Sequence, residues 1–372
     1  MTGTSSTPVF IVGVPRSGTT VLASMIAGHT GFVVGPETHF FRTLSDRRLR
    51  RAISDDRWPR EAVAALMRIE VNDTSVAEQV HVTEATLWKR LEDRPATAES
   101  MIRALTATPA PDRLLAEKTP GHLAHIERIW RYVPGARVVH MVRDPRDVAR
   151  SLAKVPWTSF SSEIAGAFEW SKRLAESEAA LRSRQDLVYN LRYEDLVRDP
   201  ELELRGLCGF LRCDFEAQML DVEDHASSVV ADGEHWKSRN AGKLVSTRSG
   251  AWRDEGSESG AKAVELLCSE QMESFGYESD CVVDRRELLL PLSGPALDAI
   301  EAQVVALALR DVSIEFTTRF LDPRPLGVAS REMRKLLPRR LALTHFVAAM
   351  VRSCLRLPIV RLVPSAPRPS MP

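Results

Sequence analysis

Three short, mainly apolar runs stand out along the chain, at residues 9–14, 137–142 and 187–191. Each is rich in Val, Ile or Leu and is bounded by charged residues or by turn formers. Runs of this kind are typical of strands that lie buried in a parallel sheet. Between them, as in 21–26 and 123–133, apolar positions recur at helical spacing, which indicates amphipathic helices.

Strands that alternate with helices predict an α/β fold, here a three-layer sandwich with helices on both faces of a mainly parallel sheet. The polar stretch 43–109 has helical spacing and several arginines, and it predicts a helical insertion. Near residue 280 the pattern changes, and 280–286 has the composition of a linker. We therefore expect one domain over 1–285 and a basic, helical C-terminal extension over 286–372 with a disordered, Pro-rich end.

The composition is that of a soluble globular protein, with 44% hydrophobic residues, 27% charged residues and no formal net charge. The charge is unevenly divided, because residues 310–372 carry 12 Lys or Arg against 4 Asp or Glu. A basic tail on an acidic body indicates an anionic partner or docking onto the body itself. It is not the uniform basic stripe of a protein that binds nucleic acid, so we expect no nucleic-acid partner.

Five scattered cysteines show neither a C-x-x-C spacing nor the even number of a disulfide framework. This pattern favours a reduced, cytoplasmic setting. Residues 1–7 are polar and do not have the pattern of a secretory signal. No clustered set of carboxylates or histidines suits a metal ion, so we expect none.

A loop with two glycines, residues 13–20, joins the first predicted strand to the first predicted helix. Its glycine spacing is that of a P-loop, in which backbone N–H groups and a helix N-terminus face an anion. Nucleotide-hydrolysing loops have lysine after the second glycine, but Thr19 stands there and the cation of this loop is Arg16. This disfavours a nucleotide kinase or hydrolase, which stays as an alternative. The candidate anion ligands are Pro15, Arg16, Ser17, Gly18, Thr19 and Thr20.

A second candidate anion site follows the strand at 137–142. Arg143 leaves the end of this strand, and Ser151 lies eight residues further on, in the next predicted helix. A fixed cation together with a hydroxyl suits a phosphate monoester. Asp144 and Asp147 are expected to orient the arginines or to cap the helix.

The run Pro-Arg-Ser-Gly-Thr-Thr at 15–20 resembles the 5′-phosphosulfate loop of the PAPS-dependent sulfotransferases. The segment 143–151 resembles the 3′-phosphate motif of the same family. The stretch 10–41 is most similar to the protein-tyrosine sulfotransferase branch, where a Glu-Thr pair follows the loop at the distance of Glu37 and Thr38. The resemblance, over roughly residues 8–255, implies a P-loop-like sheet and sulfuryl transfer from PAPS to a hydroxyl, with release of PAP.

The resemblance also implies catalytic roles. Glu37 matches the glutamate that acts as the base in the tyrosine branch, and the strand-like run and turn at 33–36 would return it beside the first loop. Lys118, in a Lys-Thr-Pro segment, is implied to contact the bridging oxygen of the leaving phosphate, while Arg16 stabilises the transferred group. His122 is the rival base, because cytosolic sulfotransferases use a histidine shortly after such a lysine.

Two further residues are implied to hold the donor. Tyr193 matches a family position after the third strand, and Lys243 belongs to a segment, 243–252, that resembles the part of the family closing over the donor. The acceptor stays open, since a phenol, a sugar, a peptide tyrosine and a lipid head group all offer hydroxyls. A non-catalytic nucleotide-binding adaptor is the remaining alternative.

The apolar stretch 341–363 is interrupted by arginines and does not predict a membrane span. Two alternatives are open for it. It packs as a helix on the acidic body or on a second copy in a homodimer, or it lies as a basic amphipathic helix on a membrane surface. Packing is the favoured alternative.

Overall fold

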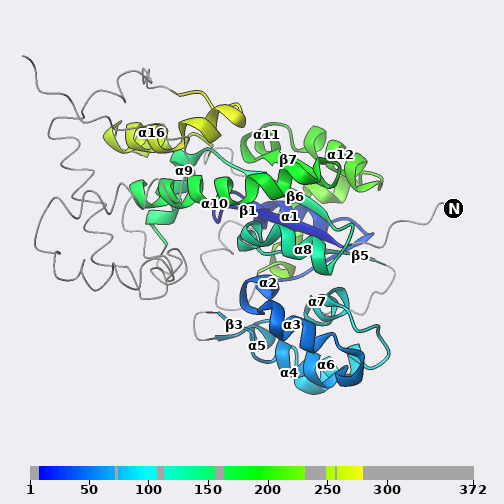
Figure 1. Ribbon diagram of the computed structural model, residues 1–372. Coiled ribbons are helices and arrows are strands. Elements are labelled where there is room, and N and C mark those ends of the chain that lie inside the picture. Colours follow the sequence, from blue (N-terminus) through cyan, green and yellow to red (C-terminus); the bar gives the residue numbers. More distant parts are fainter. Residues whose placement is uncertain are drawn as a thin grey trace, which may run out of the picture.

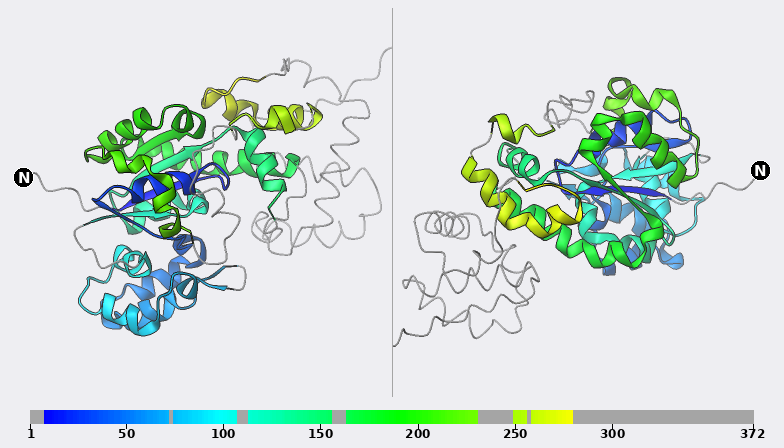
Figure 2. Two further views of the ribbon diagram at one scale, coloured as in Figure 1. Left: turned by 180° about the vertical axis from the view of Figure 1, so that it is seen from behind. Right: turned by 90° about the horizontal axis from the view of Figure 1, so that it is seen from above.

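The computed structural model describes residues 8–71, 74–106, 113–155, 163–230, 249–255 and 258–279 (Figure 1). Lys243, the predicted linker and the predicted C-terminal extension lie outside these residues. The described residues form a central sheet with helices on both faces and a group of helices at one side (Figure 2).

The central sheet has five parallel strands in the order β2-β5-β1-β6-β7. The strands are β1 (Val9–Gly13), β2 (Phe32–Val34), β5 (Leu114–Lys118), β6 (Arg137–Val142) and β7 (Val188–Arg192). The three apolar runs correspond to β1, β6 and β7, and the predicted parallel sheet is confirmed. The apolar pattern does not predict β5, whose last two residues are charged.

Side chains that alternate along β1 face two separate cores. Phe10 and Val12 belong to the core under α8, α9 and α10, whereas Val9 and Ile11 belong to the core under α1 and α12. Two helical layers around one sheet make the expected three-layer sandwich. The helices are α1 (Thr19–Ala27), α8 (Ile126–Tyr132), α9 (Pro145–Ala153), α10 (Glu163–Ser183), α11 (Tyr193–Arg198), α12 (Pro200–Leu211), α13 (Val222–His225), α15 (Trp252–Glu255) and α16 (Glu258–Ser274), with 3-10 turns η2 (Pro120–His125), η3 (Gln185–Leu187), η4 (Ala217–Leu220) and η5 (Ala226–Ser228).

The helical insertion expected over 43–109 lies between β2 and β5, and it also holds one antiparallel pair of two-residue strands. Its side chains Leu49, Leu66 and Leu105 belong to the same core as Phe10, so the insertion packs on the sheet (Figure 1). Its elements are α2 (Phe40–Thr43), α3 (Asp46–Ala52), η1 (Asp55–Arg57), α4 (Arg60–Leu66), β3 (Glu70–Val71), β4 (Thr74–Ser75), α5 (Val76–Gln79), α6 (Glu84–Leu91) and α7 (Ala98–Thr106).

Helix α16 packs along α9 and α10 (Figure 1). Its buried Glu265 accepts a hydrogen bond from Arg146 Nη1 at 2.6 Å, which ties the last described helix to the start of α9. Among the helices described, none combines the length and the apolar composition that crossing a membrane requires.

Candidate active site

The loop between β1 and α1 is shaped by two positive φ angles, 78° at Arg16 and 92° at Gly18. A Cβ atom on Gly18 would lie 2.4 Å from Cδ2 of Tyr193, so only glycine lets the loop approach this ring. Ser17 Oγ is buried and has no hydrogen-bond partner among the described residues. Residues 19–20 begin α1, so the predicted loop ends at a helix N-terminus, as an anion site of this kind requires.

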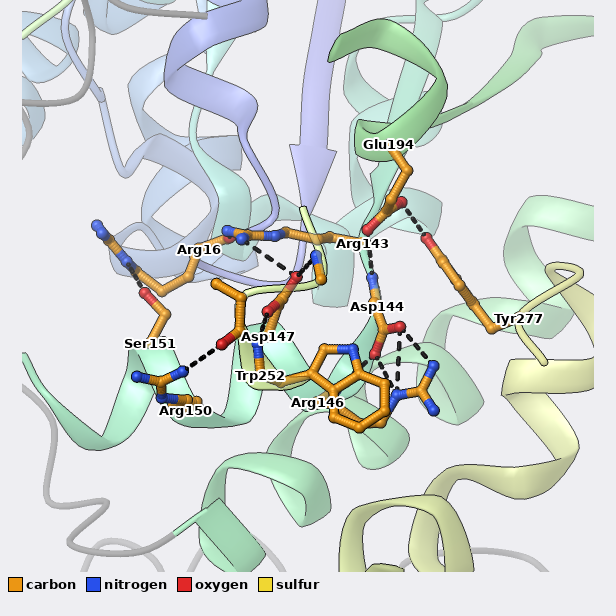
Figure 3. Close-up of polar contacts among 12 residues, drawn as sticks. Arg16, Arg143, Asp144, Arg146, Asp147, Arg150, Ser151, Glu194, Trp252 and Tyr277 are labelled. Atoms are coloured by element: carbon orange, nitrogen blue, oxygen red, sulfur yellow. Dashed lines mark hydrogen bonds and ion pairs between the residues drawn. The ribbon is translucent and has the colours of Figure 1, made fainter. Parts of the chain in front are cut away.

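The two predicted phosphate motifs lie side by side, because β1 and β6 are neighbours and their carboxyl ends meet at one edge of the sheet. Arg16 Nε donates to Ser151 Oγ at 3.0 Å. Arg143 Nη1 donates to the carbonyl oxygen of Arg16 at 3.1 Å (Figure 3). Each motif therefore holds a residue of the other, and the two form one continuous cationic site.

Arg143 is held on two further sides. Its guanidinium lies over the ring of Tyr193, 4.5 Å from the centroid, and the carboxylate of Asp147 is 3.5 Å from its Nη2. Burial raises the pKa of Asp147, while the charge of Arg143 acts in the opposite direction. These contacts fix the planar guanidinium in one orientation, as directed recognition of a phosphate requires.

Asp144 has the expected capping role. Its carboxylate accepts from the backbone N–H of Arg146 at 2.9 Å at the start of α9, and it also pairs with the Arg146 guanidinium at 2.7 Å. The same guanidinium stacks on Trp252, 3.9 Å from the ring centroid (Figure 3). The sequence does not single out Arg146 or Trp252, because their contact joins distant parts of the chain.

The last part of the segment predicted to close over the donor lies across α9. Asp147 accepts from the backbone N–H groups of Gly250 and Trp252 at 2.8 and 3.0 Å. Arg150 Nη1 donates to the carbonyl oxygen of the residue between them at 2.8 Å (Figure 3). This segment is therefore fastened beside Arg143 and Ser151, while Lys243 lies outside the described residues.

Two residues that the sequence does not indicate complete this part of the site. Glu194 accepts from the backbone N–H of Asp144 at 3.0 Å and from the hydroxyl of Tyr277 at 2.8 Å. Burial raises the pKa of Glu194. Tyr277 lies 83 residues further along the chain, and no local pattern relates the two.

Glu37 and Lys118 form an ion pair at the carboxyl ends of β2 and β5. Lys118 Nζ donates to Glu37 Oε1 at 3.0 Å, and Lys118 is fully buried, whereas Glu37 is 9% exposed. The pair forms because β2 and β5 are parallel neighbours in the sheet, so the turn after β2 returns Glu37 beside the end of β5. His39 Nε2 lies 3.4 Å from Glu37 Oε2, a contact that the sequence does not reveal.

His122, the rival base, lies fully buried beside Glu117. Its Nδ1 is 2.9 Å from Glu117 Oε2, and its Nε2 accepts from the backbone N–H of Phe41 at 3.1 Å. An accepting Nε2 places the ring proton on Nδ1, so both ring nitrogens are engaged within the protein.

Within the part of the chain that the structure describes, no group of three or more His, Cys, Asp or Glu side chains could hold a metal ion. The cations of the site are arginines and a lysine. A parallel sheet with two joined cationic sites at the carboxyl ends of its central strands defines a P-loop-like α/β protein, and cationic sites of this kind suit the anionic groups of a ligand.

Comparison with known proteins places the chain within this class. A family model described as the sulfotransferase family matches residues 8–217, which is more than half of the 372-residue chain. The chain belongs to this family, which confirms the resemblance seen in its motifs.

Individual relatives agree with this assignment. Protein-tyrosine sulfotransferase 1 of Danio rerio is 26% identical over 221 residues, which cover 58% of this chain and 56% of that protein. Carbohydrate sulfotransferase 5 of Mus musculus is 28% identical over 184 residues, covering 43% of this chain and 46% of that protein. The matched parts thus span about half the length of these relatives.

A solved structure supports the fold. The sulfotransferase domain from the curacin biosynthetic pathway superposes with a TM-score of 0.50 at 20% identity, over 73% of this chain and 98% of that domain. The chain therefore shares the sulfotransferase fold.

Proposed function

We propose that this protein transfers a sulfuryl group from PAPS to a hydroxyl acceptor and releases PAP. The observation that carries the proposal is the hydrogen bond from Arg16 to Ser151. It joins a loop suited to one phosphate with a motif suited to another, and PAPS carries anionic groups on both its 5′ and 3′ sides. The resemblance of both motifs to the donor-binding motifs of the family supports the same donor.

The residues present fit this donor. Ser17 Oγ is a buried hydroxyl with no partner in the described part of the chain, and such a group requires an explanation, which a phosphate oxygen supplies. The loop at 15–20 would hold the 5′ side, whereas Arg143 and Ser151 would hold the 3′-phosphate beside Tyr193. When bound, PAPS supplies a sulfuryl group attached to a phosphate that leaves readily.

Glu37 is the residue we assign to accept the proton of the acceptor hydroxyl. An ionised carboxylate is the form that takes up a proton, and Lys118 Nζ, 3.0 Å from Glu37 Oε1, is its counter-ion. The same lysine offers positive charge where the leaving oxygen becomes negative, and Arg16 does so for the transferred group. His122 is disfavoured as the base, because it is fully buried and both its nitrogens are engaged.

The chemistry of the site accommodates several classes of acceptor hydroxyl. A carboxylate base suits any hydroxyl, so phenols, sugars, tyrosine peptides and lipid head groups all belong in the test. One relative is named for protein tyrosine and another for carbohydrate, which supports giving these two acceptor classes priority.

The test is transfer of label from PAPS to acceptors in a metabolite extract and in a defined panel, with products identified by mass. Arg16→Ala and Glu37→Gln are expected to lower turnover by about 100-fold or more, since each removes a charge used in the transition state. Glu37→Gln should still bind PAP in calorimetry. Glu61→Gln serves as the control and should leave turnover unchanged. Glu61 lies in α4, where its carboxylate pairs with Arg51.

The proposal has clear contrary outcomes. A folded protein that gives no heat on titration with PAP would exclude the donor. Full turnover in Glu37→Gln would remove Glu37 as the base, and magnesium-dependent loss of ATP would favour a nucleotide hydrolase instead.

A further inference from the structure

We propose that Glu117 and His122 are positioning residues that hold the Glu37–Lys118 pair in place through a buried relay of hydrogen bonds. The relay consists of Glu117, Thr38, Thr119 and His122, and all four residues are fully buried. The inference rests on the proposed function, since it assigns to these residues an effect on the base.

The segment that follows Glu37 is fastened by its backbone. Three consecutive N–H groups, at positions 39, 40 and 41, each donate to a side chain of the relay. The bonds run from His39 to Thr119 Oγ1 at 3.2 Å, from Phe40 to Thr38 Oγ1 at 3.3 Å and from Phe41 to His122 Nε2 at 3.1 Å. These amides lie at the start of α2, whose N-cap residue provides no side-chain cap, so the relay does the work of a cap.

All three acceptors donate in turn to one carboxylate. Thr38 Oγ1 and Thr119 Oγ1 donate to Glu117 Oε1 at 2.7 and 2.6 Å, and His122 Nδ1 donates to Oε2 at 2.9 Å. A hydroxyl that gives its hydrogen to the carboxylate turns its lone pairs to an amide, and a ring with its proton on Nδ1 presents a bare Nε2. The carboxylate of Glu117 therefore sets the direction of every bond in the relay.

This carboxylate stays charged although it is wholly buried. Burial raises the pKa of Glu117, but contact with His122 and hydrogen bonds from Thr119 and Thr38 outweigh it, so the pKa lies below its ordinary value. An unpaired buried carboxylate would be costly, and here three side-chain donors satisfy it.

The relay reaches both members of the catalytic pair through the chain. Thr38 follows Glu37, and Glu117 precedes Lys118. Neighbouring side chains of an extended strand point to opposite sides. The Glu37–Lys118 and Thr38–Glu117 contacts therefore hold the end of β5 from both faces. His39 has a φ of 49°, a conformation that a non-glycine residue keeps only when surrounding bonds enforce it.

The first variant keeps the size of the side chain. In Glu117→Gln the amide cannot accept from all three donors: with its oxygen toward the threonines, its NH2 faces the Nδ1–H of His122. Moving that proton to Nε2 would place it against the N–H of Phe41. One link of the relay must break in either arrangement.

The second variant, Thr38→Val, removes one hydroxyl at nearly constant volume. Its matched control is Thr106→Val, because Thr106 is also buried but its hydroxyl donates to the carbonyl oxygen of Ile102 in its own helix α7.

Hydrogen exchange followed by mass spectrometry measures the relay without reference to activity. Peptides covering 38–44 should exchange at least about ten-fold faster in Glu117→Gln and Thr38→Val than in the wild type or Thr106→Val.

In the same two variants kcat should fall by about ten- to one-hundred-fold, with a shifted pH profile of kcat, because a base displaced by about 1 Å loses this much. PAP affinity and the KM for PAPS should stay within about two-fold, since residues 15–20, 143 and 151 supply most of the contacts proposed for the donor.

Each result decides one point. Wild-type exchange rates in both variants overturn the relay, and raised exchange with unchanged kcat and pH profile overturns its positioning role. Absence of PAP binding or of transfer in the wild-type protein would instead overturn the proposed function, while the exchange rates would still show whether the relay holds the segment. A Glu117→Gln chain that does not fold leaves Thr38→Val to decide.

Discussion

Three residues near the candidate active site have positive φ angles: Arg16, Gly18 and His39. For Arg16 and His39 such a backbone costs about 1–3 kcal/mol each and persists only where neighbours enforce it. Arg16 is enforced by its bonds to Ser151 and Arg143, as His39 is by the relay. Backbone strain therefore occurs in the loop at 15–20 and beside Glu37, the proposed base.

Gly18 gives a direct test of how closely the donor loop must approach Tyr193. In Gly18→Ala we expect PAP to bind about ten-fold more weakly or worse, and the free energy of unfolding to fall by about 1–3 kcal/mol, because Cβ meets the ring at a positive φ. Calorimetry and urea unfolding measure the two effects.

Gly209→Ala in α12 is the matched control, because a Cβ there meets nothing within 4 Å. It should raise the free energy of unfolding by about 0.4–1 kcal/mol and leave PAP binding alone. Equal behaviour of the two variants would contradict the role given to Gly18.

At the scale of elements, α9 organises the second half of the proposed donor site. Asp144 caps the helix and holds Arg146, Asp147 in the first turn accepts from the backbone N–H groups of Gly250 and Trp252, and the last turn carries Ser151. A single helix thereby connects the 3′-phosphate motif to the segment expected to close over the donor.

Asp147→Asn tests this connection. The amide oxygen can replace only part of the carboxylate, so we expect the N–H groups of Gly250 and Trp252 to exchange faster and PAP to bind about ten-fold more weakly, the effect of losing one charge-assisted hydrogen bond. Exchange of the peptide containing 249–255, together with calorimetry, measures both. Unchanged exchange would show that the segment is held by other contacts.

Elements differ in how well the sequence predicts them. β1 and β6 are predicted because both their faces are buried, so most of their residues are apolar. β5 ends in Glu117 and Lys118, whose burial is compensated by partners on other elements, so its pattern does not indicate a strand. The predicted roles of Arg16 and Arg143 rest on motif spacing, which local sequence carries.

At the scale of the whole molecule, the site depends on contacts that local sequence cannot show. Arg16 meets Ser151 across 135 residues, and Arg146 meets Glu265 across 119. Motifs predict Arg16 and Ser151 as parts of two anion sites for one donor, and Trp252 ends the segment 243–252 that resembles the family, but Glu265 and Tyr277 carry no motif. They become part of the site only when α16 packs along α9 and α10.

The pH dependence of stability tests whether His140, on β6, is buried as the structure shows. His140 on β6 is fully buried, bonds Asn190 at 2.9 Å and lies beside Phe275 of the α16 end, and burial lowers its pKa to about 4. Because the unfolded chain takes up this proton at higher pH than the folded chain does, stability falls as the pH drops below about 6.5.

Between pH 7 and pH 5 this one residue should lower the free energy of unfolding by about 2 kcal/mol. Urea unfolding of the wild type and of His140→Leu at both pH values measures the difference. The variant should lose about 2 kcal/mol less than the wild type over this interval, and an equal loss in both proteins would contradict the assignment.

The fastening of α2 has a consequence for how this family can diversify. The relay bonds at the root of the insertion join residues 38–41 to residues 117–122, and Arg128 on α8 adds bonds to the carbonyl oxygens of Phe41 and Leu44. A chimera that exchanges the body of the insertion for that of a relative should therefore keep the Glu37–Lys118 pair in place only if the new helices fill the core that Leu49, Leu66 and Leu105 occupy.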